Sequence, residues 1–260
     1  MITSEDIFSI SSAKQFEKMA LKVFRHQYDH NLVYRQFCDF VKKDKQTVKS
    51  LKQIPFLPIQ FFKSHDVVST IDEPQAIFTS SGTTGSITSR HLVTDVSLYE
   101  QSYRQAFSQF YGNIEDYTVL ALLPSYLERQ GSSLIHMVED LIQLSNNSNS
   151  GFYLNDYDAL VSKLLEQERD NKNVLLIGVT FALLDLIEKQ NFKLENTIIM
   201  ETGGMKGRRK EMIREELHEI LTKGFGVKSI HSEYGMTELL SQAYSLGNGI
   251  FECPSWMQIH

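Results

Sequence analysis

The sequence predicts an α/β protein in which helices flank a mostly parallel sheet. From residue 117 onward, short apolar runs alternate with stretches whose apolar residues recur at helical spacing. Strands that alternate with helices of this length are typical of parallel βαβ units. The chain has 260 residues, of which 42% are hydrophobic and 22% charged, so it can bury a large core. That composition excludes a disordered chain and a collagen-like one.

The first part of the chain is predicted to be helical. Apolar residues recur at three- and four-residue steps over residues 13–28, and a second helix is expected around Phe37. Two prolines in residues 54–59 exclude a helix interior and favour an extended segment packed on the core. We therefore divide the chain into a helical N-terminal segment, 1–53, and an α/β unit, 54–260, which together are expected to form one structural unit.

The second part alternates between strands and helices. Strands are predicted at residues 117–123, 151–154, 174–179, 197–201 and 227–232. Helices are predicted over residues 132–144, around Leu160 and Leu164, around Leu183 and Ile187, and over residues 208–223. Ligands of α/β sheets bind at the carboxyl ends of the parallel strands. The residues that directly follow these strands are therefore the first candidates for a site.

Charge and cysteine content exclude several classes of protein. The chain carries 26 basic and 32 acidic residues, a net charge of −6, so no nucleic-acid partner is expected. Its two cysteines, Cys38 and Cys253, are far apart in the sequence, which favours a reducing compartment and disfavours a structural zinc site. The N-terminus lacks the pattern of a signal peptide, and no apolar run is long enough to span a bilayer. We therefore expect a cytoplasmic protein.

A loop rich in hydroxyl groups is the first candidate for a ligand site. Residues 79–85, Thr-Ser-Ser-Gly-Thr-Thr-Gly, hold five hydroxyl residues and two glycines in seven positions. Glycine lets a backbone approach an anion closely, and hydroxyls donate hydrogen bonds to phosphate oxygens. The sequence contains neither a Walker loop nor a GxGxxG motif. Composition alone equally allows a flexible surface loop, and the exact order of the residues weighs against that alternative.

Three stretches together resemble the adenylate-forming acyl ligases, the superfamily of acyl-CoA synthetases and luciferase. They are Ser80-Ser81-Gly82-Thr83-Thr84-Gly85, then Thr202-Gly203-Gly204, then Ser232-Glu233-Tyr234-Gly235-Met236-Thr237-Glu238. Each is weak evidence alone, but they occur in the order typical of that superfamily. Within it, the chain is most similar to the LuxE-like acyl-protein synthetases, and phenylacetate-CoA ligases look similar in the same places. The supporting stretches are residues 55–58, 61–63, 89–91, 123–129 and 203–208.

The resemblance implies an enzyme that activates a carboxylic acid, expected to be a fatty acid, with ATP and Mg²⁺. The fold implied is the N-terminal large domain of the adenylate-forming enzymes. The acyl-AMP would then pass its acyl group to a thiol of a protein or of CoA, with an acyl-reductase-type protein as a further partner. The nucleotide-binding residues implied are Ser80, Ser81, Gly82, Thr83, Thr84, Gly85, Gly203, Gly204, Glu233, Tyr234 and Gly235.

The resemblance also implies individual roles. The loop from Ser80 to Gly85 would hold the β- and γ-phosphates, and Tyr234 would stack on adenine beside the glycine pair. Thr237 would donate a hydrogen bond to the α-phosphate. Glu238 would coordinate magnesium, a hard cation that takes carboxylate oxygen.

Two departures from the superfamily pattern affect these expectations. The loop usually continues with proline and lysine, which are absent here, so Arg90 or Lys206 is expected to supply the missing positive charge. Members of the superfamily also continue with a mobile C-terminal domain, and this sequence ends at His260. We therefore expect that domain to be missing. An alternative function is a catalytically incomplete nucleotide- or acyl-binding subunit of a complex.

Three further patterns that contain histidine are possible site residues. His26 and His30 stand four residues apart on a predicted helix, which favours a solvated helix face because no third metal ligand is evident. Ser64, His65 and Asp66 are adjacent, and adjacent side chains cannot form a catalytic triad. His91 either contributes to the site or starts a strand.

Overall fold

The computed structural model describes residues 2–81, 87–124, 129–203, 209–210 and 212–260. Its α-helices are α1 (Ser4–Phe8), α2 (Ala13–His30), α3 (Leu32–Phe40), α4 (Phe61–Ser64), α5 (Val96–Tyr111), α6 (Ser133–Leu144), α7 (Tyr157–Arg169), α8 (Thr180–Lys189) and α9 (Arg214–Phe225). Two 3-10 helices cover Leu51–Gln53 and Ile114–Asp116. The strands are β1 (Ala76–Thr79), β2 (Arg90–Val93), β3 (Thr118–Leu122), β4 (Gly151–Phe152), β5 (Val174–Val179), β6 (Thr197–Thr202), β7 (His231–Tyr234) and β8 (Ala243–Ser245).

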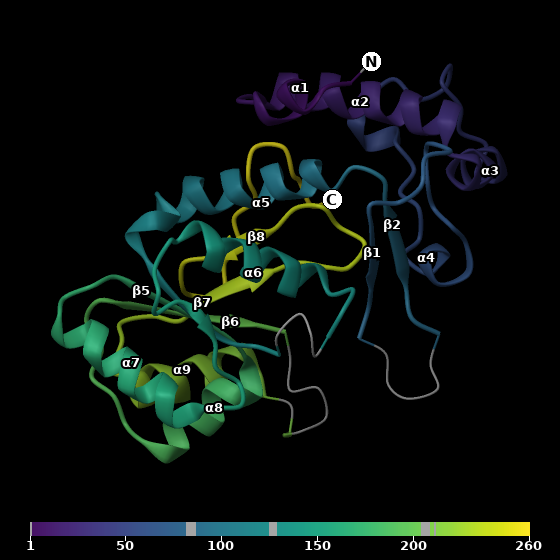
Figure 1. Ribbon diagram of the computed structural model, residues 1–260. Helices are drawn as coiled ribbons and strands as arrows, with labels where there is room; N and C mark the ends of the chain where they lie inside the picture. The colour runs from purple at the N-terminus through teal and green to yellow at the C-terminus, as the bar shows by residue number, and fades with distance from the viewer. Residues whose placement is uncertain (1, 82–86, 125–128, 204–208, 211) are drawn as a thin grey trace.

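The predicted α/β architecture with a mostly parallel sheet is confirmed. Six strands form one sheet in the order β4-β3-β5-β6-β7-β8, and every described pair in it is parallel except β7 with β8. Helices α5 and α6 cover one face of the sheet, and α7, α8 and α9 cover the other (Figure 1). Strands β3 and β5 are buried at every position because both faces are covered, which explains their uninterrupted apolar sequences.

The structure corrects three predicted element boundaries and adds one strand. Helix α9 begins at Arg214 rather than near residue 208, and Arg209 instead pairs with Asp185 and Glu188 of α8. The strand predicted at residues 227–232 is β7, which begins at His231, where its pairing with Met200 of β6 starts. Gly226 ends α9 in a left-handed conformation. The strand predicted at 151–154 covers only two residues, and the antiparallel strand β8 was not predicted.

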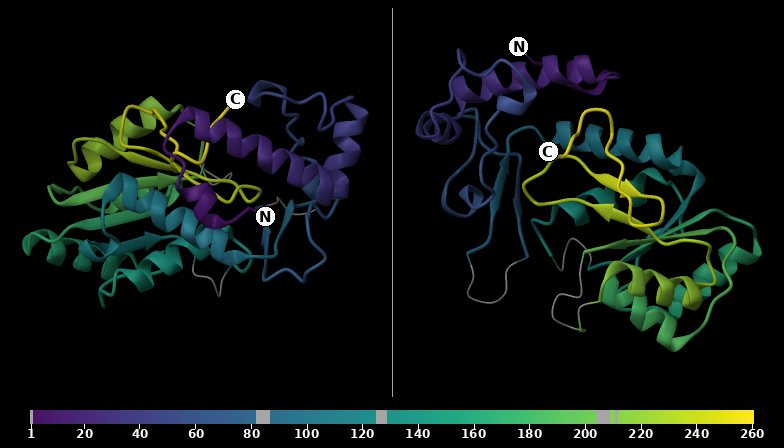
Figure 2. Two further views of the ribbon diagram at one scale, coloured as in Figure 1. Left: turned by 90° about the horizontal axis from the view of Figure 1, so that it is seen from above. Right: turned by 180° about the vertical axis from the view of Figure 1, so that it is seen from behind.

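A second, two-stranded sheet stands beside the six-stranded sheet in both views of Figure 2. Its strands β1 and β2 are antiparallel, and they flank the hydroxyl-rich loop. The backbone N–H of Thr79 donates to the carbonyl of Gly131, 2.7 Å away, which ties the end of β1 to the segment before α6. Thr79, Ser80 and Ser81, the described start of the hydroxyl-rich loop, thereby lie near the segment that leads into α6.

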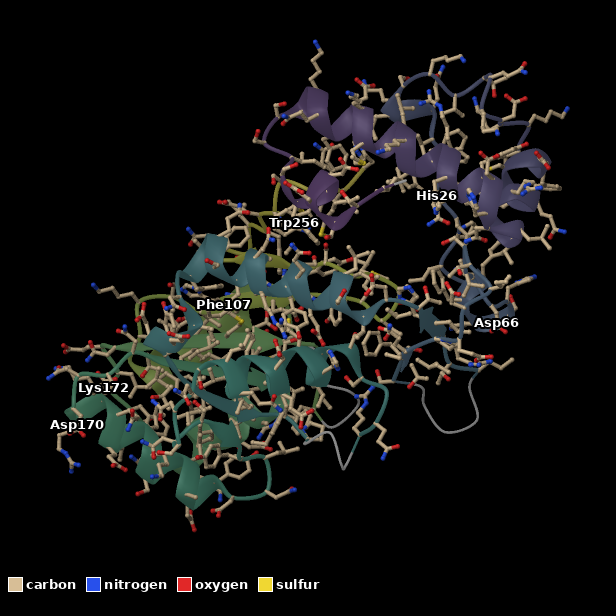
Figure 3. The ribbon with its side chains drawn as sticks, turned by 45° about the horizontal axis from the view of Figure 1, so that its top comes forward. His26, Asp66, Phe107, Asp170, Lys172 and Trp256 are labelled. Carbon is tan, nitrogen blue, oxygen red and sulfur yellow. The ribbon has the colours of Figure 1, made fainter. Side chains whose placement is uncertain are left out.

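The helices of the N-terminal segment have a small apolar core of their own. Phe24, Tyr34, Cys38 and Val48 are buried together there. Trp256, near the C-terminus, lies between these helices and α5 (Figure 3), where its ring meets Phe8 edge-on at 5.0 Å. The division at residue 53 stays a prediction. Among the described residues, no helix has the length and apolarity that a membrane span requires.

Candidate functional site

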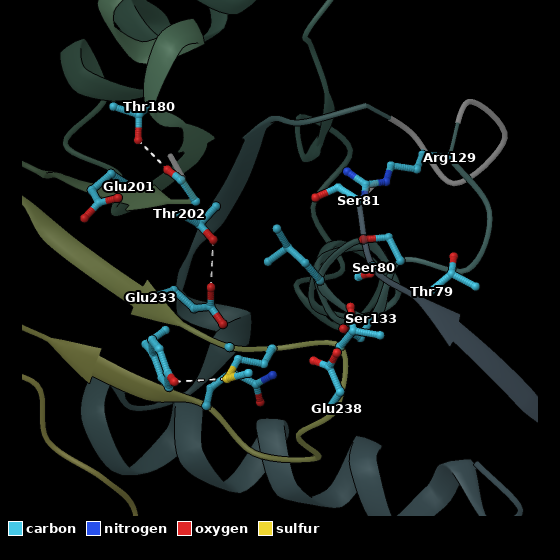
Figure 4. Close-up of a pocket in the computed structure, with 18 of the residues that line it drawn as sticks. Thr79, Ser80, Ser81, Arg129, Ser133, Thr180, Glu201, Thr202, Glu233 and Glu238 are labelled. Atoms are coloured by element: carbon cyan, nitrogen blue, oxygen red, sulfur yellow. Dashed lines mark hydrogen bonds between the residues drawn. The ribbon is translucent and has the colours of Figure 1, made fainter. Parts of the chain in front are cut away.

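A cavity of about 500 Å³ opens at the carboxyl ends of β6 and β7, as the α/β architecture predicts. It is lined mainly by polar side chains from seven separate stretches of the described chain (Figure 4). The lining residues are Thr79, Ser80, Ser81, Arg129, Ser132, Ser133, Leu134, Thr180, Glu201, Thr202, Gly203, Arg214, Glu233, Tyr234, Gly235, Met236, Thr237, Glu238, Gln242 and Phe251.

The sheet divides the polar side chains at this edge into two layers. Side chains alternate between the two faces along each strand, and Thr202 pairs in register with Glu233. Both of these side chains face α5. Glu201 pairs in register with Ser232, and both face α9, where Glu201 meets Arg214 and His218.

Glu233 is a buried carboxyl on the α5 side. The hydroxyl of Thr202 donates a hydrogen bond of 2.7 Å to its Oε2, as Figure 4 shows. Burial raises the pKa of Glu233 to about 7, against a smaller lowering by the Thr202 hydrogen bond. Near neutral pH this carboxyl is therefore divided between its protonated and ionised forms.

A hydrogen-bonded chain behind Glu233 orients Gln242. The hydroxyl of Tyr99 donates to the carbonyl of Ser133 at 3.1 Å, so it can only accept from the Gln242 amide nitrogen, 2.9 Å away. The side-chain oxygen of Gln242 is buried and has no hydrogen-bond partner in the described part of the chain. One wall of the cavity therefore holds a fixed amide next to Ser133, at the N-terminal end of α6.

Aromatic and cationic side chains form the wall on the α9 side. The Tyr234 ring is 37% exposed and lies 6.0 Å from the Phe251 ring at a steep angle. The guanidinium of Arg214 stands 4.9 Å above the Phe251 ring, and its Nε is 3.6 Å from Glu201 Oε1. The exposed face of the Tyr234 ring, next to Phe251 and Arg214, is suited to stacking on a planar ring of a ligand.

His91 connects the small sheet to the segment after β7. Its Nδ1 lies 2.9 Å from the carbonyl oxygen of Thr237, and it packs edge-on against Phe62. Burial lowers the pKa of His91 below its ordinary value, so the neutral ring donates from Nδ1 to that carbonyl at neutral pH. His91 therefore lies in a strand, β2, as one of the two alternatives predicted, and its ring also supports the backbone of Thr237, a predicted site residue.

The structure brings most of the described candidate residues together. Ser80, Ser81, Gly203, Glu233, Tyr234, Gly235, Thr237 and Glu238 all line the cavity. Six candidates lie outside the described residues: Gly82, Thr83, Thr84, Gly85, Gly204 and Lys206. Arg90 does not line the cavity, and its guanidinium lies 3.6 Å from Asp66 beside the small sheet (Figure 3 labels Asp66).

Sequence reasoning missed several lining residues, above all Arg129, Arg214, Glu201 and Gln242. Arg129 is the last residue of the family-like stretch 123–129, and its position after a predicted strand end is the signal that identifies it as a candidate. Arg214 lies inside the helix predicted at residues 208–223, and the sequence does not show that its side chain points into the cavity. Glu201 was read as the last residue of a strand, and no local signal marks the face to which it points.

Two motifs set aside from the sequence do not form sites. Ser64 contacts His65 at 2.8 Å, but Asp66 pairs with Arg90. The rings of His26 and His30 stack 4.3 Å apart on α2, where His30 Nδ1 also contacts the carbonyl of His26. Within the described ranges, no three His, Cys, Asp or Glu side chains converge on a possible metal position.

The lining fits a magnesium ion that accompanies a phosphorylated ligand. Glu238 offers a half-buried carboxylate, and Thr237 and Ser81 offer hydroxyl oxygens in the same cavity. Magnesium prefers such hard oxygen ligands and often binds through one or two carboxylates plus phosphate oxygens and water. A single protein carboxylate is therefore compatible with this metal only when the ligand supplies phosphate.

The fold is shared with a solved ligase structure. The chain superposes with a TM-score of 0.57 on a solved structure of 2-hydroxyisobutyryl-CoA ligase in an open conformation, in complex with 2-HIB-AMP and CoA. The match covers 90% of this chain and 56% of that chain at 12% sequence identity, so it shows a shared fold. The fold is that of the adenylate-forming ligases.

The family is shown by sequence. The model of the family described as acyl-protein synthetase, LuxE matches residues 1–251, and the chain belongs to this family. A curated relative is the long-chain-fatty-acid–luciferin-component ligase of Photorhabdus luminescens, 37% identical over 70 residues. That match covers 26% of this chain and 60% of the relative. The chain thus spans less than two thirds of both the relative and the solved structure.

Proposed function

We propose that this protein uses ATP to activate a carboxylic acid as an acyl-AMP. The observation that carries the proposal is the convergence of three separate stretches on one cavity. Ser80 and Ser81 follow β1, Gly203 follows β6, and the stretch from Tyr234 to Glu238 begins at the last residue of β7. Membership of the LuxE acyl-protein synthetase family supports the same activity.

The proposal assigns roles to the described residues of the cavity. Ser80 and Ser81 hold the outer phosphates together with the rest of the loop, and Arg129 adds a positive charge on the same side. The N-terminus of α6, capped by Ser132, directs its partial positive charge into this part of the cavity. Tyr234 stacks on the adenine ring, and Thr237 donates to the α-phosphate.

The chemical step requires positioning and charge neutralisation rather than a protein nucleophile. A substrate carboxylate oxygen forms a bond to the α-phosphorus, and the bond from that phosphorus to the pyrophosphate oxygen breaks. Magnesium held at Glu238 would neutralise negative charge on the phosphates. The backbone of Thr237 is held in place because His91 donates a hydrogen bond to its carbonyl oxygen.

The second half of the proposal concerns the acyl group. A fatty acid is the proposed substrate, in keeping with the name of the Photorhabdus luminescens relative. A thiolate then attacks the acyl carbonyl, the acyl–phosphate bond breaks, and AMP leaves. The thiol belongs to a protein or to CoA, and an acyl-reductase-type protein is the proposed partner. A cytoplasmic location belongs to the same proposal, because the reaction draws on ATP.

Pyrophosphate exchange tests the proposal. Labelled pyrophosphate should enter ATP only when the correct acid is present, and a panel of acids from short to long chain identifies it. The double variant Thr83→Val, Thr84→Val should reduce ATP affinity strongly. ATP binding without exchange for any acid would favour the alternative, a nucleotide-binding subunit that lacks catalysis. Failure to bind ATP would contradict the proposal and leave only the acyl-binding form of the alternative.

A further inference from the structure

We propose that Glu201 is the residue that selects adenine in the cavity, by accepting a hydrogen bond from the 6-amino group of the base. The inference rests on the proposed function, which stacks the base on Tyr234. It adds a residue that determines nucleotide specificity and that none of the three motif stretches contains.

The position of Glu201 relative to Tyr234 is the first argument. Glu201 pairs in register with Ser232, and Tyr234 lies two residues further along the same strand. Side chains two residues apart share a face, so Glu201, Ser232 and Tyr234 all face α9. Neighbouring strands are about 4.8 Å apart and two residues span about 6.6 Å, so a purine on Tyr234 bridges the interval to Glu201.

The contacts of the carboxylate are the second argument. Glu201 lines the cavity although it is only 5% exposed. Arg214 Nε and His218 Nε2 both lie 3.6 Å from its Oε1, which is too far for hydrogen bonds. No described residue donates a hydrogen bond to either oxygen. A buried carboxylate that lacks donors is costly unless a ligand supplies one.

Few other side chains near Glu201 could form a hydrogen bond with the edge of the adenine ring. The hydroxyl of Ser232, next to Glu201, is buried and has no hydrogen-bond partner among the described residues. Phe251 and Arg214 close the cavity on the outer side, and Arg214 stacks on Phe251 while it faces Glu201. Glu233, the other buried acid, points to the opposite face of the sheet and is bonded to Thr202.

The chemistry of the purine edge gives the direction of the selectivity. Adenine presents an amino donor at position 6, whereas guanine and hypoxanthine present a carbonyl acceptor there. A carboxylate can only accept hydrogen bonds, so it attracts the amino group and repels the carbonyl oxygen. Glu201 should therefore favour ATP over a nucleotide with a 6-oxo group.

ITP is the appropriate probe because its base carries a 6-oxo group and lacks the 2-amino group of guanine. We would measure ATP and ITP binding by calorimetry with magnesium, using the wild-type chain, Glu201→Gln and the exposed control Glu216→Gln. The amide can donate to a 6-oxo group, so Glu201→Gln should lower the preference for ATP about tenfold or more. Glu216→Gln should leave the preference unchanged.

The wild-type protein provides a second measurement that needs no variant. Purine riboside triphosphate, which carries only hydrogen at position 6, should bind about tenfold or more weakly than ATP. Equal binding of this analogue and ATP would overturn the inference, as would an ATP preference that survives in a folded Glu201→Gln protein. Both results leave the proposed function intact, whereas absence of binding to every nucleotide would overturn the function and this inference with it.

Discussion

Gly235 lies so close to Glu233 that a Cβ atom at residue 235 would stand 2.6 Å from Glu233 Oε1. The same atom would lie 3.4 Å from the Gln242 amide nitrogen. The glycine after Tyr234 is therefore explained by space, because the buried carboxyl occupies the volume that any larger side chain would need. A family-like motif residue and a buried acid thus depend on each other.

Gly235→Ala should destabilise the protein. The added methyl group must displace the Glu233 carboxyl, and the Thr202 hydrogen bond is lost or strained. We expect the free energy of unfolding to fall by about 1–3 kcal/mol, measured by urea denaturation. The matched control is Gly151→Ala, whose Cβ would meet only ordinary contacts, the nearest at 3.6 Å. Equal effects of the two substitutions would contradict this account of Gly235.

Glu233 should make stability depend on pH. Its pKa is about 7 in the folded protein against a reference value of 4.5, so the folded state binds the proton more tightly. The stabilisation that the protonated Glu233 carboxyl contributes is complete at pH values below about 4.5, and it is lost as the pH rises through about 7. Relative to Glu233→Gln, the wild-type free energy of unfolding should fall by about 3 kcal/mol across that range. Denaturation curves of both proteins at several pH values would show it; parallel curves would exclude a raised pKa.

The variant Glu238→Gln tests whether Glu238 is a metal ligand or a structural residue. Removing the charge while keeping the shape should lower adenylation roughly 100-fold or more if the carboxylate holds magnesium. The melting temperature should change little. We would measure pyrophosphate exchange and thermal unfolding together, with Glu216→Gln as the control. Normal exchange with a lowered melting temperature would assign Glu238 a structural role.

Arg129→Gln and Arg90→Gln compare two sources of positive charge. Arg129 lines the cavity, whereas Arg90 pairs with Asp66 outside that lining. We expect Arg129→Gln to weaken ATP binding by about tenfold, because a charged hydrogen bond to phosphate is lost. Arg90→Gln should have a much smaller effect. Calorimetric titration of ATP measures both, and a larger loss for Arg90→Gln would restore the original prediction for that residue.

Apolar spacing was sufficient to predict most of the parallel sheet. Strands β3, β5 and β6 and helices α2 and α6 were predicted to within a few residues, because helical and extended backbones impose different periods on a buried face. The incorrect predictions occur where a contact between residues far apart in the sequence determines whether an element forms or where it begins. Arg209 pairs with α8 instead of opening α9, and β8 forms because it pairs with β7.

The sequence by itself determined the class of fold, the family and the three stretches that meet at the cavity, because these depend on local periodicity and on residue order. Only the tertiary structure decided which charged groups join those stretches. Glu201 and Thr202 are neighbours in sequence, yet strand register places one beside Arg214 and the other on Glu233. Register depends on how helices pack on both faces of the sheet, and a one-residue shift would exchange these two environments.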